Sequence, residues 1–171
     1  MGQTAGWATF QGEHRNLAGY AYAASVPPGL TGYRAPAPAP DHGFAIDLAS
    51  DFDAHIWVDG SYNVAFARSA RAVAEGRLGW IREKGKIIGR PRFHNSELGG
   101  LHGVELAVQY FDNATGTTRS FTSITALRGR ADPDDPVGIV YEISLDTSSD
   151  RIAKDKIVWR SVLRSFTLLP Q

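Results

Sequence analysis

The chain contains no cysteine among its 171 residues, and this absence removes several kinds of chemistry at once. Disulfide bonds, thiolate catalysis, cysteine-ligated zinc and iron–sulfur clusters are all excluded, because each requires a cysteine sulfur. The cellular compartment stays open, since proteins of the cell envelope also often lack cysteine.

The sequence also lacks an excess of charge and a long apolar run. Eighteen basic residues balance eighteen acidic ones, so no overall field favours nucleic acid or an anionic membrane. No apolar stretch approaches the roughly 18 residues of a membrane-spanning helix. The first residues do not show the basic and then apolar pattern of a signal peptide. We therefore expect no nucleic-acid partner and no transmembrane segment.

Recognisable catalytic motifs are missing as well. The Gly-x-Ser-x-Gly motif of many hydrolases does not occur. The segment from Gly79 to Lys86 resembles a phosphate-binding loop, but five residues rather than four separate its glycines. Ile87 also stands where such a loop carries a metal-binding hydroxyl. These absences favour a protein that is not an enzyme and holds no cofactor.

The strongest structural pattern lies in residues 138–166. Its first part alternates with a period of two, as a strand with one buried face does: Ile139, Tyr141, Ile143 and Leu145 alternate with Val140, Glu142 and Ser144. Residues 147–150 form a helix-start signal. Apolar residues then recur at helical spacing, at Ile152, Trp159, Val162, Leu163 and Phe166. The pattern predicts a strand followed by a helix that packs back across its sheet.

The remaining elements are read from the same signals. Strand patterns cover residues 20–26, 44–48, 55–58, 62–66, 87–88, 104–110 and 120–127. Asp59-Gly60 is typical of a hairpin turn, and Ser69 is a suitable cap for a helix that reaches Lys84. Residues 101–145 have links too short for parallel crossovers and predict an antiparallel meander. We expect one domain over residues 1–171, with an arm or edge strand at 1–19 and a Pro-rich loop at 27–42.

These elements predict an α+β fold with a single, largely antiparallel twisted sheet flanked by helices. The order resembles the Mog1/PsbP/DcrB-like group. The resemblance depends on the early hairpin, the helix at residues 69–84, Leu98-Gly99-Gly100 before the meander, and the final helix that ends at residues 163–168. It implies a role as an accessory subunit, inhibitor or immunity protein, chaperone or other binding protein. It also favours a periplasmic or envelope location over the cytoplasm.

Two groups of ionisable residues are candidates for a metal-dependent enzyme or small hydrolase, which is the alternative function. The spacing of Asp51, Asp53 and His55 places three ligands on one strand face. The second group is His94, Glu97 and His102, with Glu105 nearby. Each group also has a structural interpretation, as a polar turn and as a hydrogen-bonded histidine at a strand end.

A protein-binding surface is the leading hypothesis. The residues that alternate with the buried positions of the best strands are His55, Trp57, Glu105, Gln109 and Glu142. An aromatic side chain among carboxylates suits a protein surface, whereas a small-molecule pocket is more apolar. We therefore expect these five residues to form one patch, with Trp57 as the anchor and the two glutamates supplying charge.

Overall fold

The structure is a computed structural model that describes residues 8–12, 22–34, 40, 42–49, 54–129 and 138–169. Its strands are β1 (Ala8–Gly12), β2 (Tyr22–Val26), β3 (Gly32–Tyr33), β4 (Gly43–Asp47), β5 (His55–Tyr62), β6 (Gly85–Leu98), β7 (Leu101–Asp112), β8 (Thr117–Arg128), β9 (Ile139–Ser148) and β10 (Thr167–Leu168). Its helices are α1 (Ala70–Lys84) and α2 (Ile152–Ser165). None of the helices in these ranges is long and apolar enough to cross a membrane.

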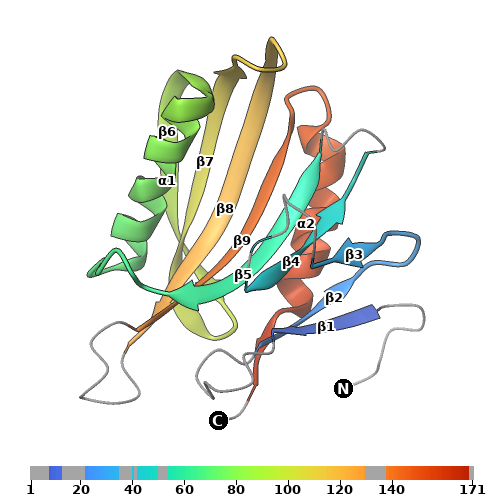
Figure 1. Cartoon of the computed structure of the whole chain (residues 1–171), viewed down its shortest axis with the longest axis vertical. Coiled ribbons are helices and arrows are strands. Elements are labelled where there is room, and N and C mark those ends of the chain that lie inside the picture. The colour runs from blue at the N-terminus through green and yellow to red at the C-terminus, as the bar shows by residue number, and fades with distance from the viewer. Residues whose placement is uncertain are drawn as a thin grey trace.

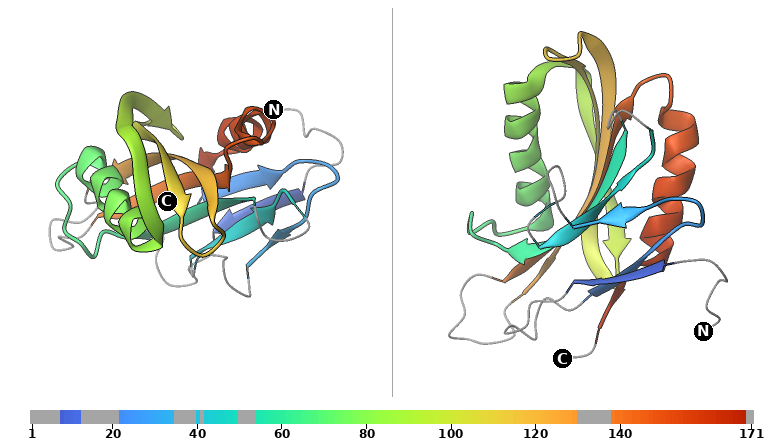
Figure 2. Two further views of the ribbon diagram at one scale, coloured as in Figure 1. Left: turned by 90° about the horizontal axis from the view of Figure 1, so that it is seen from above. Right: turned by 45° about the vertical axis from the view of Figure 1, so that its right-hand side comes forward.

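A seven-stranded antiparallel sheet forms the centre of the molecule (Figure 1). Its strand order is β3-β4-β5-β9-β8-β7-β6. Helix α1 lies on one face of this sheet and α2 lies on the other, as the turned views show (Figure 2). A second, three-stranded sheet, β1-β2-β10, packs beside α2. The α+β class and the twisted antiparallel sheet between helices are confirmed. Of the strand expected at residues 20–26, the described part is β2, and it belongs to the small sheet.

Strand β9 organises the main sheet because it pairs with β5 on one side and β8 on the other. Tyr141, Ile143 and Leu145 point toward α2 and are fully buried. The alternating side chains are also buried, although they include Glu142 and Asp146. The period of two therefore predicted the strand correctly, but both of its faces are covered.

Two hydrophobic cores lie on opposite faces of the sheet. The core on the α2 side joins that helix and the small sheet to β4, β5 and β9, with Trp159 and Phe166 from the C-terminal part of the chain. The core on the α1 side joins Ala74, Leu78 and Ile81 to apolar residues of β7 and β8. Strand β7 thus directs its apolar face toward α1, while β9 directs its own toward α2.

The first helix begins where its cap residue predicts. The Ser69 side chain accepts a hydrogen bond from the amide of Ala72 at 3.2 Å. The helix ends at Lys84, and Gly85 starts β6 at once. A Cβ at Gly85 would lie 1.8 Å from the carbonyl oxygen of Phe111, so the close approach of β6 to β7 requires glycine here.

Three local expectations are corrected by the structure. Asp59-Gly60 is not a hairpin turn, because β5 continues through both residues and pairs with β9 up to Tyr62. Strand β6 is not short: it runs for 14 residues, and a shift of register between Ile88 and Arg92 absorbs Gly89 and Pro91. The start signal before α2 does not act as a side-chain cap. Instead, the Thr147 hydroxyl donates to the buried Asp155 carboxylate at 2.6 Å.

Candidate functional site

The α1 side of the sheet collects polar and aromatic side chains from β5 and β9. Trp57 stands beside Ser144 in the β5–β9 register, and Asp59 stands beside Glu142. Their neighbours Ile56 and Val58 point the other way, into the core on the α2 side. Alternation along β5 therefore brings one aromatic and one acidic side chain to the same face.

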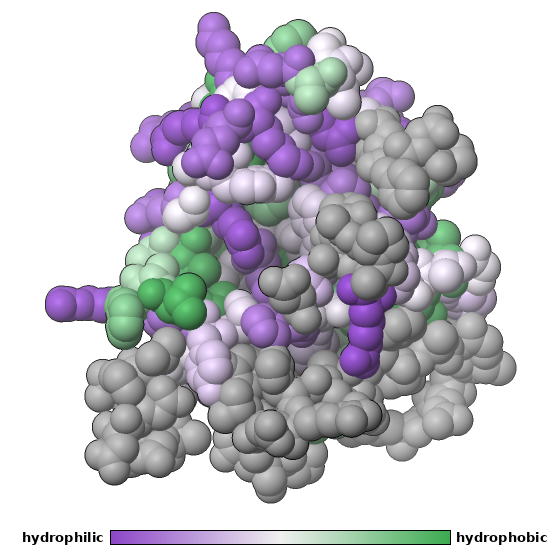
Figure 3. All heavy atoms as spheres, viewed as in Figure 1, coloured by the Kyte–Doolittle hydropathy of each residue, from purple (hydrophilic) through white to green (hydrophobic). Residues whose placement is uncertain are grey.

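A hollow of about 210 Å³ opens on this face, beside α1. Helix α1 packs over β6, β7 and β8, so it covers only part of the face (Figure 1). We call this space the α1-side hollow. Its lining residues are Pro40, Trp57, Asp59, Arg77, Trp80, Phe121, Glu142 and Ser144. In the space-filling view, hydrophilic side chains predominate over α1 on this side of the molecule (Figure 3).

Aromatic rings form one wall of the hollow. Trp57 and Trp80 meet edge to face, with ring centroids 5.9 Å apart, and Phe121 lies 5.7 Å from Trp80. The ring of His55 packs against Trp57 at 4.0 Å. The ammonium of Lys84 lies 4.1 Å from the centroid of Trp80. These rings fix one another and present a rigid aromatic surface next to a cation.

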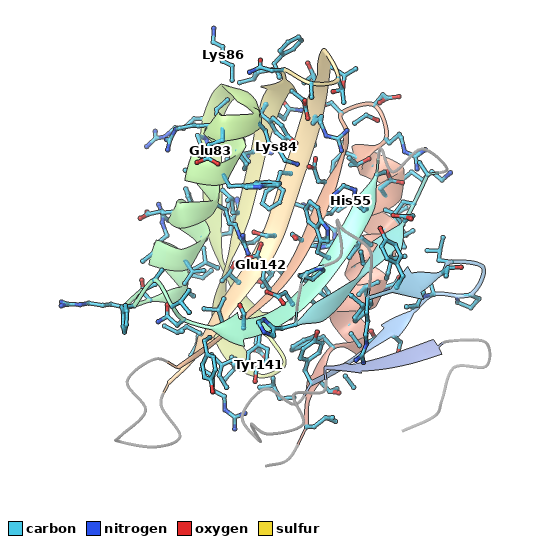
Figure 4. The ribbon with its side chains drawn as sticks, in the orientation of Figure 1. His55, Glu83, Lys84, Lys86, Tyr141 and Glu142 are labelled. Atoms are coloured by element: carbon cyan, nitrogen blue, oxygen red, sulfur yellow. The ribbon has the colours of Figure 1, made fainter. Side chains whose placement is uncertain are left out.

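Carboxylates form the opposite part of the hollow. Arg77 Nε donates to Glu142 Oε2 at 2.7 Å, and this ion pair joins α1 to β9. Glu142 is only 3% exposed, and burial raises its pKa although Arg77 opposes the shift. Burial also raises the pKa of Asp59, against a hydrogen bond from Ser61. Figure 4 shows Glu142, Lys84 and His55 on the α1 side of the sheet.

A buried ionic network adjoins the aromatic wall. Asp146 accepts hydrogen bonds from the Tyr110 hydroxyl at 2.9 Å and from Arg119 Nε at 3.0 Å. Lys84 Nζ lies 3.7 Å from the same carboxylate. Asp146 is thus surrounded by donors and cations, as a buried carboxylate must be. The network anchors Lys84 at the end of α1 and leaves it above the tryptophan rings.

No protein-family model matches the chain, and no curated protein matches its sequence. Solved structures do match over nearly the whole length. LpqN of Mycobacterium tuberculosis, involved in cell envelope biogenesis, superposes with a TM-score of 0.68 at 16% identity, covering 96% of this chain and 92% of LpqN. The chain has the Mog1/PsbP-like fold.

Two further structures carry the same Mog1/PsbP-like fold. The cyanobacterial PsbP of Synechocystis, CyanoP, has a TM-score of 0.55 at 14% identity, with 98% of this chain and 95% of CyanoP covered. The Ran-binding protein Mog1p of Saccharomyces cerevisiae has a TM-score of 0.53 at 15% identity, with coverages of 95% and 96%. At these identities the likeness concerns the fold alone.

On this Mog1/PsbP-like sheet the five residues expected to form one patch lie on two faces. His55, Trp57 and Glu142 are on the α1 side, where His55 is buried and only 6% exposed. Glu105 is on the α2 side, where Lys156 of α2 donates to it at 2.9 Å. Gln109 shares the face of Glu105 because the two positions differ by four along β7. The prediction that these five residues form one continuous patch is therefore wrong.

The second group of ionisable residues is divided in the same way. In the β6–β7 hairpin, Glu97 pairs with His102 and His94 pairs with Glu105. His94 and Glu97 are an odd number of positions apart, so the two pairs face opposite sides of the sheet. Over the described ranges, no group of three His, Asp or Glu side chains is placed to hold a metal ion. Asp51 and Asp53 lie outside those ranges.

The hollow contains residues that the sequence did not single out as site residues. Asp59 stands in a dipeptide typical of a hairpin turn, although it shares the parity of Trp57 because β5 extends beyond it. No local sequence pattern marks Arg77 as a site residue, because its ion-pair partner Glu142 is 65 positions away in the chain. Trp80 and Phe121 look like ordinary core residues in the sequence, and both do support the core on the α1 side.

Proposed function

We propose that this chain is a non-catalytic protein-binding module that receives a partner protein at the α1-side hollow, with Trp57 as the anchor. We further propose a role as an envelope accessory, inhibitor or chaperone-like protein. The fold supports this proposal through its members: Mog1p binds Ran, and LpqN is involved in cell envelope biogenesis.

The observation that carries the proposal is the composition of the hollow. Half-buried tryptophans and an ion pair meet on a part of the sheet that α1 leaves uncovered. Aromatic and arginine side chains in such partly desolvated positions supply much of the binding energy at protein interfaces. At about 210 Å³ the hollow is smaller than the roughly 300–1,000 Å³ of sites for drug-sized ligands, which favours a side chain of a partner.

Affinity capture with matched variants tests the proposal. The tagged protein is expressed in its native host, bound proteins are identified by mass spectrometry, and the dissociation constant of each purified candidate is measured. We expect Trp57→Ala to weaken the partner by about 30-fold, equivalent to a hot-spot loss of about 2 kcal/mol. Ile157→Ala, at an exposed position on α2, should change the constant less than twofold.

The variants also guard against a trivial loss of folding. Trp57 packs against His55 and Trp80, so Trp57→Ala is accompanied by a thermal melt and by Trp57→Phe, which retains a ring. A partner that binds folded Trp57→Ala and Trp57→Phe as tightly as the parent contradicts the proposal. So does a partner whose affinity is lost only in Ile157→Ala.

A further inference from the structure

We infer that the α1-side hollow accepts a lysine ammonium group of the partner, held between its aromatic wall and Asp59. This inference rests on the proposed function and names the chemistry that the site recognises. The notable features are a cation already bound on the aromatic wall, an unsatisfied carboxylate oxygen and a restricted volume.

The protein's own Lys84, which Asp146 also holds, already places an ammonium against the aromatic wall. Its Nζ lies 4.1 Å from the centroid of Trp80 and 6.0 Å from that of Trp57. A cation within about 6 Å of an indole face is attracted by the negative face of the ring system. Trp57 belongs to both the wall and the hollow, and a second ammonium entering from the hollow meets the same chemistry.

The balance of charge at the other end of the hollow favours a cation. Arg77 is the guanidinium that lines the space, and its charge interacts with both Glu142 and Asp59. Glu142 takes the direct contacts with Arg77, at 2.7 Å. His42 lies near Asp59 and favours its ionised form when protonated. One lining cation therefore stands beside two lining carboxylates.

Asp59 offers a single acceptor to an incoming group. Its Oδ1 atom is buried and has no hydrogen-bond partner among the residues that the structure describes. A lone buried acceptor costs free energy until a donor satisfies it. A guanidinium binds carboxylates best through two parallel hydrogen bonds, whereas an ammonium is a point charge with rotatable donors. One free oxygen therefore suits lysine better than arginine.

A titration followed by NMR tests the inference without any partner protein. The probes are Nα-acetyl-lysine methylamide and its uncharged counterpart Nα-acetyl-norleucine methylamide, added to the ¹⁵N-labelled full chain. We expect saturable shifts of the indole N–H signals of Trp57 and Trp80 with the lysine probe, with a dissociation constant in the range of roughly 1–10 mM. The signal of Trp159, buried in the core on the α2 side, serves as the internal reference.

Two substitutions make the test specific. Asp59→Asn keeps the shape of the side chain and removes its charge, and should weaken the lysine probe at least tenfold. Glu75→Gln alters an exposed acid of α1 that pairs with Arg71, and should leave binding within twofold. Equal affinity for the norleucine probe, an unaffected Asp59→Asn variant, or no saturable shift of Trp57 and Trp80 overturns the inference.

The two experiments fail independently. If the hollow binds no ammonium while Trp57→Ala still weakens a partner, the docking surface stands and the lysine chemistry is wrong. If the lysine probe binds but no partner depends on Trp57, the ammonium site stands and the proposed function is wrong.

Discussion

Trp159 shows how one residue joins α2 to the sheet. Its side chain is 1% exposed, and its indole Nε1 donates to the carbonyl oxygen of Ile143 on β9 at 3.2 Å. Lys156 lies above the ring, with Nζ 5.5 Å from the centroid. The ring therefore combines apolar burial with a satisfied polar atom, which is what a tryptophan in a core requires.

Replacement of this residue should be costly. We expect Trp159→Ala to lower the free energy of unfolding by roughly 3–5 kcal/mol, because it leaves a large cavity in the core. Urea unfolding followed by circular dichroism measures the change. Exposed Ile157, two positions earlier on α2, provides the control, and Ile157→Ala should cost less than about 1 kcal/mol. A loss below about 1 kcal/mol for Trp159→Ala would contradict the packing described here.

For the secondary-structure elements, the sequence predicts which strands and helices form better than it predicts which face of the sheet their apolar side chains enter. Alternation in β7 and β9, the cap at Ser69 and the spacing in α2 predicted these elements correctly. Alternation along a strand does not indicate on which of the two covered faces of the sheet its apolar side chains lie. Val108 and Tyr110 pack under α1, while Tyr141 and Ile143 pack under α2. The predicted single patch, which contains Glu105 and Glu142, therefore requires both strands to direct their apolar residues to the same face, and they do not.

Two residues that line the α1-side hollow could not be predicted from the sequence, because their positions depend on contacts between segments far apart in the chain. Trp57 is predicted as a site residue because it alternates with the buried positions of its own strand. Arg77 became visible as a site residue only through its contact with Glu142, since the two are far apart in the chain. The sequence does not predict Asp59 as a site residue, because Asp59-Gly60 is a turn signal and the continuation of β5 depends on pairing with β9.

The Arg77–Glu142 ion pair fastens α1 to β9, and breaking it from one side should destabilise the protein. We expect Arg77→Met to cost about 2 kcal/mol at pH 7 in urea unfolding. This is less than the 3–5 kcal/mol of a fully buried pair, because the Arg77 side chain is 41% exposed. The double variant Arg77→Met/Glu142→Gln should recover most of the loss, since no buried charge then lacks its partner.

The pH dependence of Arg77→Met gives an independent check with a definite sign. Arg77 opposes the effect of burial on the pKa of Glu142, so its removal leaves that pKa raised further in the folded state. Because the pKa of Glu142 is higher in the folded state, its contribution to stability is fully present below its unfolded-state pKa near 4.5. That contribution is lost as the pH rises through the folded-state pKa. The difference from the parent should therefore shrink at pH 4. An equal difference at pH 4 and pH 7 would contradict this account.

At the scale of the whole molecule, both cores contain fully buried tyrosines. Tyr22 and Tyr141 lie in the core on the α2 side, and Tyr110 lies in the core on the α1 side. Burial raises the pKa of all three phenols, and the Asp146 carboxylate raises that of Tyr110 further. These hydroxyls stay neutral in the folded protein at a pH where an unfolded chain ionises them.

A rise in pH above 10 should therefore lower the free energy of unfolding, because tyrosines in both cores resist ionisation in the folded state. Because the folded-state pKa values are raised, the contribution is complete below pH 10 and is lost as the pH rises above it. Tyr22 and Tyr110 should each remove about 1.4 kcal/mol at pH 11, and the raised pKa of Tyr141 should add to this loss. Urea unfolding at pH 8 and pH 11 measures the loss.

Tyr22→Phe separates this effect from other alkaline titrations. The Tyr22 hydroxyl donates over long distances to the carbonyl oxygens of His42 at 3.2 Å and Val58 at 3.4 Å, so the variant removes only weak hydrogen bonding and one ionisable group. Its loss between pH 8 and pH 11 should be smaller than that of the parent by about 1.4 kcal/mol. Equal losses in both proteins would show that Tyr22 does not report on the core.

The two edges of the main sheet govern which contacts with other molecules are open to it. A long free strand edge invites another chain to add a strand, which leads to aggregation. At one edge, β3 offers only two residues. At the other, the register shift and Pro91, which has no amide hydrogen, interrupt β6. Among the described residues, β3 is short and β6 is divided at Pro91, which limits the length of strand that another chain can add at either edge of the main sheet.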